Sequence, residues 1–213
     1  MIELYSYWRS SAAYRVRIAL NWKRLEYRIY PVHLTKGGGE QFSPWFKAMN
    51  PSHAVPILRH QDNTLHQSLA IIEYLDERFP SPPLLPKSAP DRAIVRALAL
   101  DIAADTHPLN NLRVLNYLQK TLGHNETTKT AWYQHWVATS LQALETRLAQ
   151  SEGKYCHGDA VTMADACLVP QIYNAQRFDC DLTPYPKIVA IYQHLLTFEA
   201  FQAAKPKRQP DAE

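Results

Sequence analysis

Three side chains that could bind an anion stand together near the start of the chain: Arg9, Ser10 and Ser11. Residues 2–7 before them favour a β-strand, whereas residues 12–20 after them place apolar side chains at helical spacing. The first turn of a helix has unpaired N–H groups and a partial positive charge. The sequence therefore predicts a strand-to-helix turn suited to holding an anion.

The two serines also fit a purely structural role. Serine is a preferred N-cap residue, so Ser10 or Ser11 could simply cap the predicted helix. Capping and anion binding are compatible, and this stretch alone does not separate them.

A second polar helix start is predicted at Gln67 and Ser68. Ser68 is expected to be the N-cap, because residues 69–76 carry an apolar stripe at helical spacing. This start is a second candidate anion site.

Between these two starts, Pro56 stands at the entrance to an apolar strand. A cis Val55–Pro56 bond would turn the backbone of Val55 outward, free to pair with an extended peptide. A trans proline opening the strand is the simpler interpretation of the dipeptide by itself.

The elements that would position these residues change character along the chain. Residues 1–80 are predicted to form a strand, a helix, a strand, a β-hairpin and a helix, the layout of a thioredoxin-like α/β domain. Residues 81–90 continue a proline-rich linker, and residues 91–213 show only helical patterns. We therefore predict an N-terminal thioredoxin-like domain, a linker and an all-α C-terminal domain.

Two local signals refine the helical part. Pro108 interrupts a long helical pattern that has Ile94 among its apolar markers, so a break is expected near Thr106. Thr162 and Asp165 have the spacing of a capping box, which predicts a structural helix start.

Composition limits the classes of function. The chain has 213 residues and a net charge of +3, which is too mild to indicate a nucleic-acid partner. The run 205–208 is basic and is predicted to be a solvated tail. Cys156, Cys167 and Cys180 have no disulfide or zinc spacing, and no signal or membrane-spanning segment is apparent. We expect a cytoplasmic protein with reduced thiols, no metal site and no membrane partner.

Several motifs together resemble one family. Ser10-Ser11 followed by Arg15-Val16-Arg17-Ile18-Ala19-Leu20 resembles the signature of the zeta-class glutathione transferases. The segments that resemble the same class are Asn50-Pro51 with Val55-Pro56, Gln67 to Leu75, Asp181 to Pro186 and Arg208 to Asp211. The class commonly has cysteine where this chain has Ala12, so a redox role for the helix start is not expected.

The resemblance implies glutathione as cofactor and assigns roles by position. Catalytic roles are implied for Arg9, Ser10, Ser11 and Arg177. The implied glutathione-binding positions are Ser10, Ser11, Arg15, Gln41, Val55, Pro56, Gln67, Ser68, His107, Asn111 and Arg113.

Within that set, the serines would face the sulfur, and the Val55 backbone would pair with the cysteinyl unit, which favours the cis form of Pro56. Gln67 and Ser68 would hold the γ-glutamyl carboxylate, and Gln41 would lie near the glycyl end.

The chemistry that the resemblance implies is cis–trans isomerisation. Reversible addition of the glutathione thiolate to maleylacetoacetate, a cis-unsaturated diketo acid, would give fumarylacetoacetate in tyrosine and phenylalanine breakdown. Three alternatives stay open: isomerisation of the shorter maleylpyruvate, a conjugating or peroxidase transferase, and a non-catalytic interaction protein. The family also implies a homodimer.

Overall fold

The computed structural model describes residues 1–151 and 153–213, which form two compact units. The first unit contains Met1–Leu85 and Leu196–Glu213, and the second contains Pro86–Leu195. The sequence had placed the whole of 91–213 in one helical domain, so the C-terminal segment differs from that expectation. It belongs to the first unit because its carbonyls and the Asp211 carboxylate accept hydrogen bonds from α1 (Ser11–Trp22) and from Trp8, which follows the first strand.

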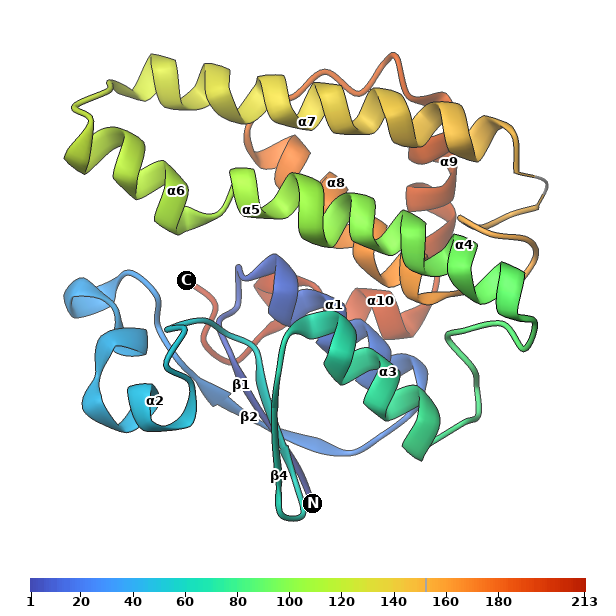
Figure 1. Ribbon diagram of the computed structural model, residues 1–213, viewed down its shortest axis with the longest axis horizontal. Coiled ribbons are helices and arrows are strands. Elements are labelled where there is room, and N and C mark those ends of the chain that lie inside the picture. The colour runs from blue at the N-terminus through green and yellow to red at the C-terminus, as the bar shows by residue number, and fades with distance from the viewer. Residues whose placement is uncertain (152) are drawn as a thin grey trace. The chain divides into compact units, whose positions relative to one another are not determined.

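The first unit is built on a four-stranded sheet of order β2-β1-β3-β4 (Figure 1). Its strands are β1 (Ile2–Ser6), β2 (Tyr27–Pro31), β3 (Ile57–His60) and β4 (Asn63–His66). β1 runs parallel to β2 and antiparallel to β3, and β3 and β4 form a hairpin. This is the predicted thioredoxin-like layout.

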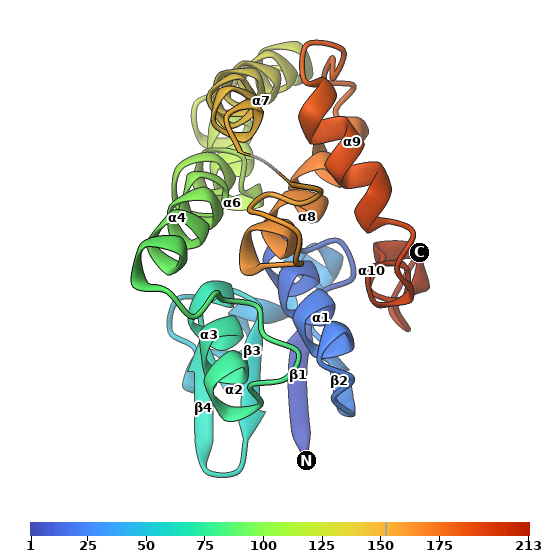
Figure 2. The ribbon, with the colours of Figure 1, turned by 90° about the vertical axis from the view of Figure 1, so that its right-hand side faces the viewer.

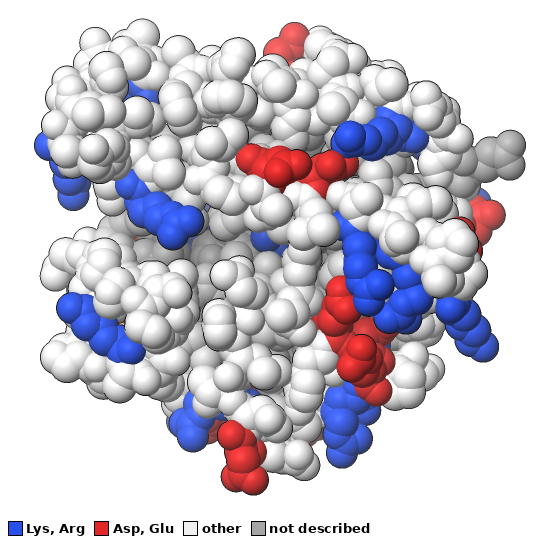
Figure 3. Space-filling view, in the orientation of Figure 1, with Lys and Arg blue, Asp and Glu red and all other residues white. Residues whose placement is uncertain are grey.

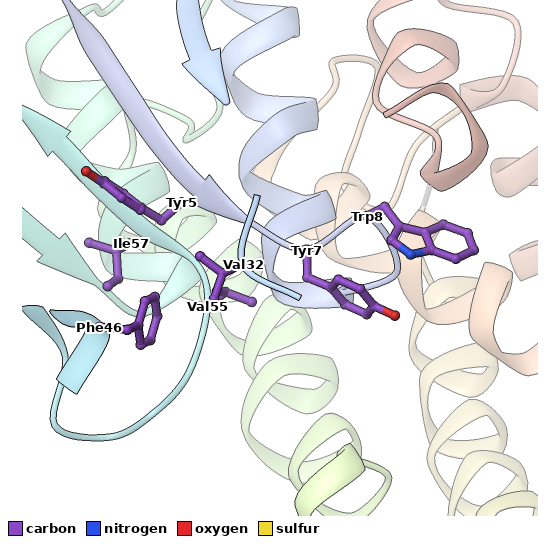
Figure 4. Packing of buried hydrophobic residues seen from close by; sticks show 7 residues of the cluster. All are labelled: Tyr5, Tyr7, Trp8, Val32, Phe46, Val55 and Ile57. Atoms are coloured by element: carbon purple, nitrogen blue, oxygen red, sulfur yellow. The ribbon is translucent and has the colours of Figure 1, made fainter. Parts of the chain in front are cut away.

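Helices cover both faces of this sheet. α1 (Ser11–Trp22) and α3 (Ser68–Arg78) lie on one face, α2 (Pro44–Met49) lies on the other, and α10 (Glu199–Ala203) packs beside α1 (Figure 2). Side chains alternate along a strand, so each inner strand contributes to both layers of the core. On the α2 face the buried cluster comprises Tyr5, Tyr7, Trp8, Val32, Phe46, Val55 and Ile57, shown in Figure 4.

A buried ion pair fixes the end of this unit. The ammonium of Lys23 lies 2.7 Å from Oδ1 of Asp76 on α3 and also donates to the carbonyls of Phe79 and Pro82, both at 2.8 Å. The Asp76 carboxylate accepts the N–H of Leu84 at 2.7 Å. These bonds hold the proline-rich segment against α1 and α3.

The second unit is all-helical over the residues described. Its α-helices are α4 (Ala89–Leu100), α5 (His107–Leu109), α6 (Leu112–Asn116), α7 (Glu126–Ala149), α8 (Met163–Arg177) and α9 (Pro186–Leu195). Two π-helical segments, Asp101–Thr106 and Tyr117–Thr121, extend α4 and α6.

The proline break lies later in the chain than predicted. The backbone stays helical through Thr106 and His107 and leaves helical geometry at Asn110 and Asn111. A proline has no N–H and its ring crowds the carbonyl four residues earlier. The wider π-helical turn directly before Pro108 relieves this crowding, so the helix continues past the expected break.

The capping box at the start of α8 is confirmed. The Thr162 N–H and hydroxyl both donate to Oδ2 of Asp165, at 2.7 and 2.8 Å, and the Cys156 N–H donates to Oδ1 at 2.9 Å. Burial raises the pKa of the Asp165 carboxyl. The helix runs on through Pro170 to Arg177.

Surface charge is mixed. On the face drawn in Figure 3, basic and acidic side chains are interspersed. None of the helices within 1–151 and 153–213 has the length and apolar character needed to span a bilayer.

Candidate functional site

Three segments far apart in the sequence meet at one edge of the sheet. Tyr5 of β1 lies opposite Ile57 of β3, and Ile57 lies opposite His66 of β4. The chain following β1, the chain preceding β3 and the chain following β4 therefore leave the sheet at the same end. These are the segments that contain Ser10, Val55 and Gln67.

Ser10 is the N-cap of α1, which confirms the capping prediction. Its backbone is extended (φ −68°, ψ 118°), and its Oγ accepts the Ala13 N–H at 3.2 Å. Ser10 is half-buried, whereas Ser11 is the first helical residue and is only 5% exposed. Since a hydroxyl that accepts one hydrogen bond can still donate, Ser10 retains a donor for a ligand, and the role implied for Ser11 stays a prediction.

Arg9 is held over an aromatic surface. Its Nη2 donates to the Tyr7 hydroxyl at 3.1 Å, and its guanidinium carbon lies 4.7 Å from the Trp8 ring centroid. The side chain is half-buried, so it stays accessible while its direction is restricted.

The start of α3 differs by one residue from the prediction. Gln67, not Ser68, precedes the helix; its φ of +70° is unusual for a residue with a side chain, and it makes no side-chain cap bond. Ser68 is the first helical residue and is buried, and its hydroxyl accepts from Nη1 of Arg15 at 3.2 Å. Arg15 is 2% exposed and therefore supports the α3 start from inside.

The Val55–Pro56 peptide bond is cis, as the resemblance suggested. The Val55 side chain packs in the α2-face cluster. Its backbone N–H and C=O form no hydrogen bond with the residues that the structure describes. Both groups are thus available to an extended chain.

Gln41 is committed to its own loop. It is 7% exposed, its Nε2 donates to the Leu34 carbonyl at 3.1 Å, and its amide lies over Gly39. Gly39 has a φ of +105°, a backbone conformation that residues with a side chain rarely adopt, so this position favours glycine. Gln41 shapes the loop that ends at α2.

The remaining predicted residues belong to the second unit. Asn111 caps α6 by accepting the Arg113 N–H at 3.1 Å, and the Arg113 side chain is exposed. His107 begins α5 and is half-buried. Arg177 ends α8, is exposed, and donates to Oδ1 of Asn174 at 3.1 Å. Their part in glutathione or substrate binding stays a prediction.

The thiols of the chain are poorly suited to act as nucleophiles. Cys156 and Cys167 are buried, and burial raises the pKa of Cys156 well above its ordinary value. Burial, with a smaller contribution from Asp179, raises the pKa of Cys180 to about 11. A thiolate is the reactive form, so a reactive sulfur at this site has to come from a ligand.

Two residues that hold the Ser10 turn were not predicted: Arg17, which is fully buried, and Asp211. Both lie in motifs that carried the resemblance, but nothing in their spacing indicated contact with the turn.

The chain matches two family models, Glutathione S-transferase, N-terminal domain, over residues 4–83, and Glutathione S-transferase, C-terminal domain, over residues 110–203. The chain belongs to the glutathione S-transferase family, and its relatives place it in the zeta class.

Those relatives are similar over nearly their whole length. A "Probable maleylacetoacetate isomerase" of Vibrio cholerae is 52% identical, covering 98% of this chain and 97% of its own. The "Maleylacetoacetate isomerase" of Mus musculus is 49% identical, covering 98% and 94%.

Solved structures agree with this. A holo structure of maleyl pyruvate isomerase, described as a zeta-class bacterial glutathione-S-transferase, has a TM-score of 0.96 at 45% identity and covers 99% of this chain and 100% of its own. A maleylacetoacetate isomerase from Methylobacterium extorquens, solved with bound malonate and GSH, has a TM-score of 0.95 at 40% identity, covering 99% of each chain.

Proposed function

We propose that this protein is a glutathione-dependent cis–trans isomerase that converts maleylacetoacetate into fumarylacetoacetate. The observation that supports this proposal is that two polar helix starts and the unpaired backbone of Val55 meet at one edge of the sheet. Burial also raises the pKa of Cys156 and Cys180, so these thiols of the chain are not activated. The names of its full-length relatives support the same reaction.

The residues at this edge fit glutathione. The N–H groups at the start of α3, with the exposed Gln67 and the Ser68 hydroxyl, suit the γ-glutamyl carboxylate. The N–H and C=O of Val55 suit the backbone of the cysteinyl unit. Ser10, the N-cap of α1, would then lie beside the thiol of glutathione.

Glutathione, when bound, supplies the thiolate that adds reversibly to the substrate double bond and leaves unchanged. Ser10 keeps its O–H free to donate toward the sulfur while its Oγ accepts from Ala13. The N-terminal field of α1 also favours negative charge. Both effects lower the pKa of a bound thiol.

Two arginines are proposed to recognise the acidic substrate. A guanidinium binds a planar carboxylate or enolate in bidentate fashion. Arg9 is accessible beside Ser10, and Arg177 is exposed at the end of α8. His107, Asn111 and Arg113 are proposed to contribute from the helical unit.

Maleylpyruvate isomerisation is the second candidate. A "Maleylpyruvate isomerase" of Ralstonia is 45% identical over 99% of this chain, and the two reactions require the same thiolate chemistry. Comparing kcat/KM for the two substrates with one preparation decides between them.

We further propose a cytoplasmic homodimer. Ile94, an apolar marker of the predicted helix, is 47% exposed on α4, as is Leu100, and Trp45 is 49% exposed on α2. Apolar surface of this kind favours association between copies. Cys156, Cys167 and Cys180 form no disulfide with one another, which fits a reducing compartment. Sedimentation equilibrium is expected to give twice the chain mass.

The test of the reaction is loss of maleylacetoacetate absorbance with and without glutathione. Turnover that requires glutathione without consuming it supports the proposal. Binding of glutathione without turnover on either substrate would indicate a conjugating enzyme, and no binding at all would indicate a non-catalytic protein.

A further inference from the structure

Ionic side chains hold the Ser10 turn from two sides. The Trp8 N–H donates to Oδ2 of Asp211 at 3.0 Å, and the Trp8 C=O accepts from Nη2 of Arg17 at 3.0 Å. Both backbone groups of a residue two positions before Ser10 are thus fixed by charge-assisted hydrogen bonds.

Arg17 joins this turn to the C-terminal segment. Its Nη1 donates to Oγ of Ser6 at 3.0 Å, and its Nε donates to the Ala204 carbonyl at 3.1 Å. The side chain is 0% exposed, and these hydrogen bonds to its guanidinium all lie inside the first unit.

Residues 209–213, here called the C-terminal strap, are docked against the first unit, although Pro210 and Glu213 stay exposed. The buried Gln209 donates to the carbonyls of Ala203 and Lys205, at 2.9 and 2.8 Å. Ala212 packs against the α2-face cluster, and Oε1 of Glu213 lies 2.9 Å from Nε2 of His33. Three separate contacts therefore fix the strap beside the turn.

Trp8, whose N–H is held by Asp211 of the strap, also supports the side chain of Arg9. The guanidinium of Arg9 lies over the Trp8 ring and bonds to the hydroxyl of Tyr7, and Figure 4 shows these two rings on the stretch that follows β1. Since a side chain follows its backbone, holding the Trp8 N–H holds the surface on which Arg9 lies. Trp8 itself is 5% exposed, so its N–H would be buried without a partner if Asp211 were removed.

We propose that Asp211 is a positioning residue, through which the C-terminal strap holds Arg9 and Ser10 in the geometry that acts on the bound thiol and the substrate. The catalytic part of this inference rests on the proposed function, whereas the structural part does not.

The structural part is tested on the free protein by amide hydrogen exchange. Asp211→Ala is expected to speed exchange of residues 7–13 about tenfold, the loss expected for one charge-assisted hydrogen bond, and to leave α7 and α8 unchanged. Lys207→Ala is the matched control, because Lys207 is exposed and lies just before the strap. Glu213→Gln should affect residues 33–36 most and residues 7–13 less than Asp211→Ala does.

The catalytic part is tested by kinetics. Asp211→Ala is expected to lower kcat about tenfold and to raise the pH at which bound glutathione ionises, with little change in the KM for glutathione, since Val55 and Gln67 are untouched. Asp211→Asn retains an oxygen acceptor, so both effects should be smaller.

The outcomes are distinct. If the wild-type protein neither binds glutathione nor isomerises either substrate, the proposed function fails while the exchange experiment still tests the strap. If Asp211→Ala matches Lys207→Ala in exchange or in kcat, or if exchange rises throughout the molecule, the positioning role is overturned. If Asp211→Ala does not fold, Asp211→Asn replaces it in both experiments. Exchange rates or a kcat for Asp211→Asn equal to those of Lys207→Ala would then overturn the proposal.

Discussion

Arg15 and Ser68 join the two helix starts that carry the candidate site: Nη1 of the α1 arginine donates to Oγ of the α3 serine across 3.2 Å. Both side chains are buried, so this bond sets the spacing of α1 and α3 from within the unit. Any ligand that spans both helix starts depends on it.

Ser68→Ala is therefore expected to weaken glutathione binding about tenfold, the value of roughly one buried hydrogen bond. Isothermal titration measures the change. Thr64→Ala, an exposed hydroxyl at the far end of the β3–β4 hairpin, serves as control and should bind as wild type. Equal affinities for the two variants would remove Ser68 from the site.

Ser10→Ala is expected to lower kcat by about tenfold to a hundredfold and to raise the pH at which bound glutathione ionises. The variant loses the donor to sulfur and also the cap, so helix stability falls by about 1 kcal/mol. Ser10→Thr keeps the hydroxyl and should recover most of the activity. An unaltered pH profile in Ser10→Ala would contradict the role given to this hydroxyl.

Arg177→Ala is expected to raise the KM for the keto-acid substrate more than the KM for glutathione, because the proposed role concerns the substrate carboxylate. Arg147→Ala removes a comparably exposed arginine of the same unit and should leave both constants unchanged. Parallel loss of both affinities in Arg177→Ala would indicate a folding effect.

Lys23→Met is expected to destabilise the protein by about 3 kcal/mol, since it leaves the Asp76 carboxylate buried without its counter-ion. Urea unfolding followed by circular dichroism measures the change. Lys36→Met, at an exposed position, is the control. A difference below about 1 kcal/mol, the range of a surface pair, would show that water compensates the charge.

The rate of Cys180 alkylation is expected to rise with pH, and the midpoint of this rise is expected at about pH 11, because burial disfavours the thiolate. The pKa of Cys180 is higher in the folded protein than in the unfolded chain. Its contribution to the free energy of unfolding is therefore fully present below the unfolded-state pKa and is lost as pH rises through about 11. Cys180→Ser identifies the signal. A midpoint near the ordinary thiol value of about 8.5 would contradict the shielding.

Local pattern predicted the elements that position the site. β-forming residues predicted β1, alternation predicted β2, and the cap at Ser10 follows from residue type. Ser68 was misplaced by one residue because the positive φ at Gln67 has no signature in the side chain. The break after Pro108 was misplaced because π-helical winding is a response of the backbone that periodicity does not register.

The contacts that hold the Ser10 turn could not be predicted in the same way. Arg17 and Asp211 reach the turn through the fold, and neither apolar spacing nor turn chemistry marks such partners. The run 205–208 shows the same limit: Lys207 and Arg208 are exposed as predicted, yet Pro206 is buried.

The bond between Trp8 and Asp211 joins residues 203 positions apart. The second unit is therefore an insertion within the first, between Leu85 and Leu196. During synthesis the ribosome must deliver the whole of that insertion before the opening strand and helix receive their final partners. We expect a nascent chain stalled before Ala204 to show a protease-resistant helical part and a susceptible N-terminal part.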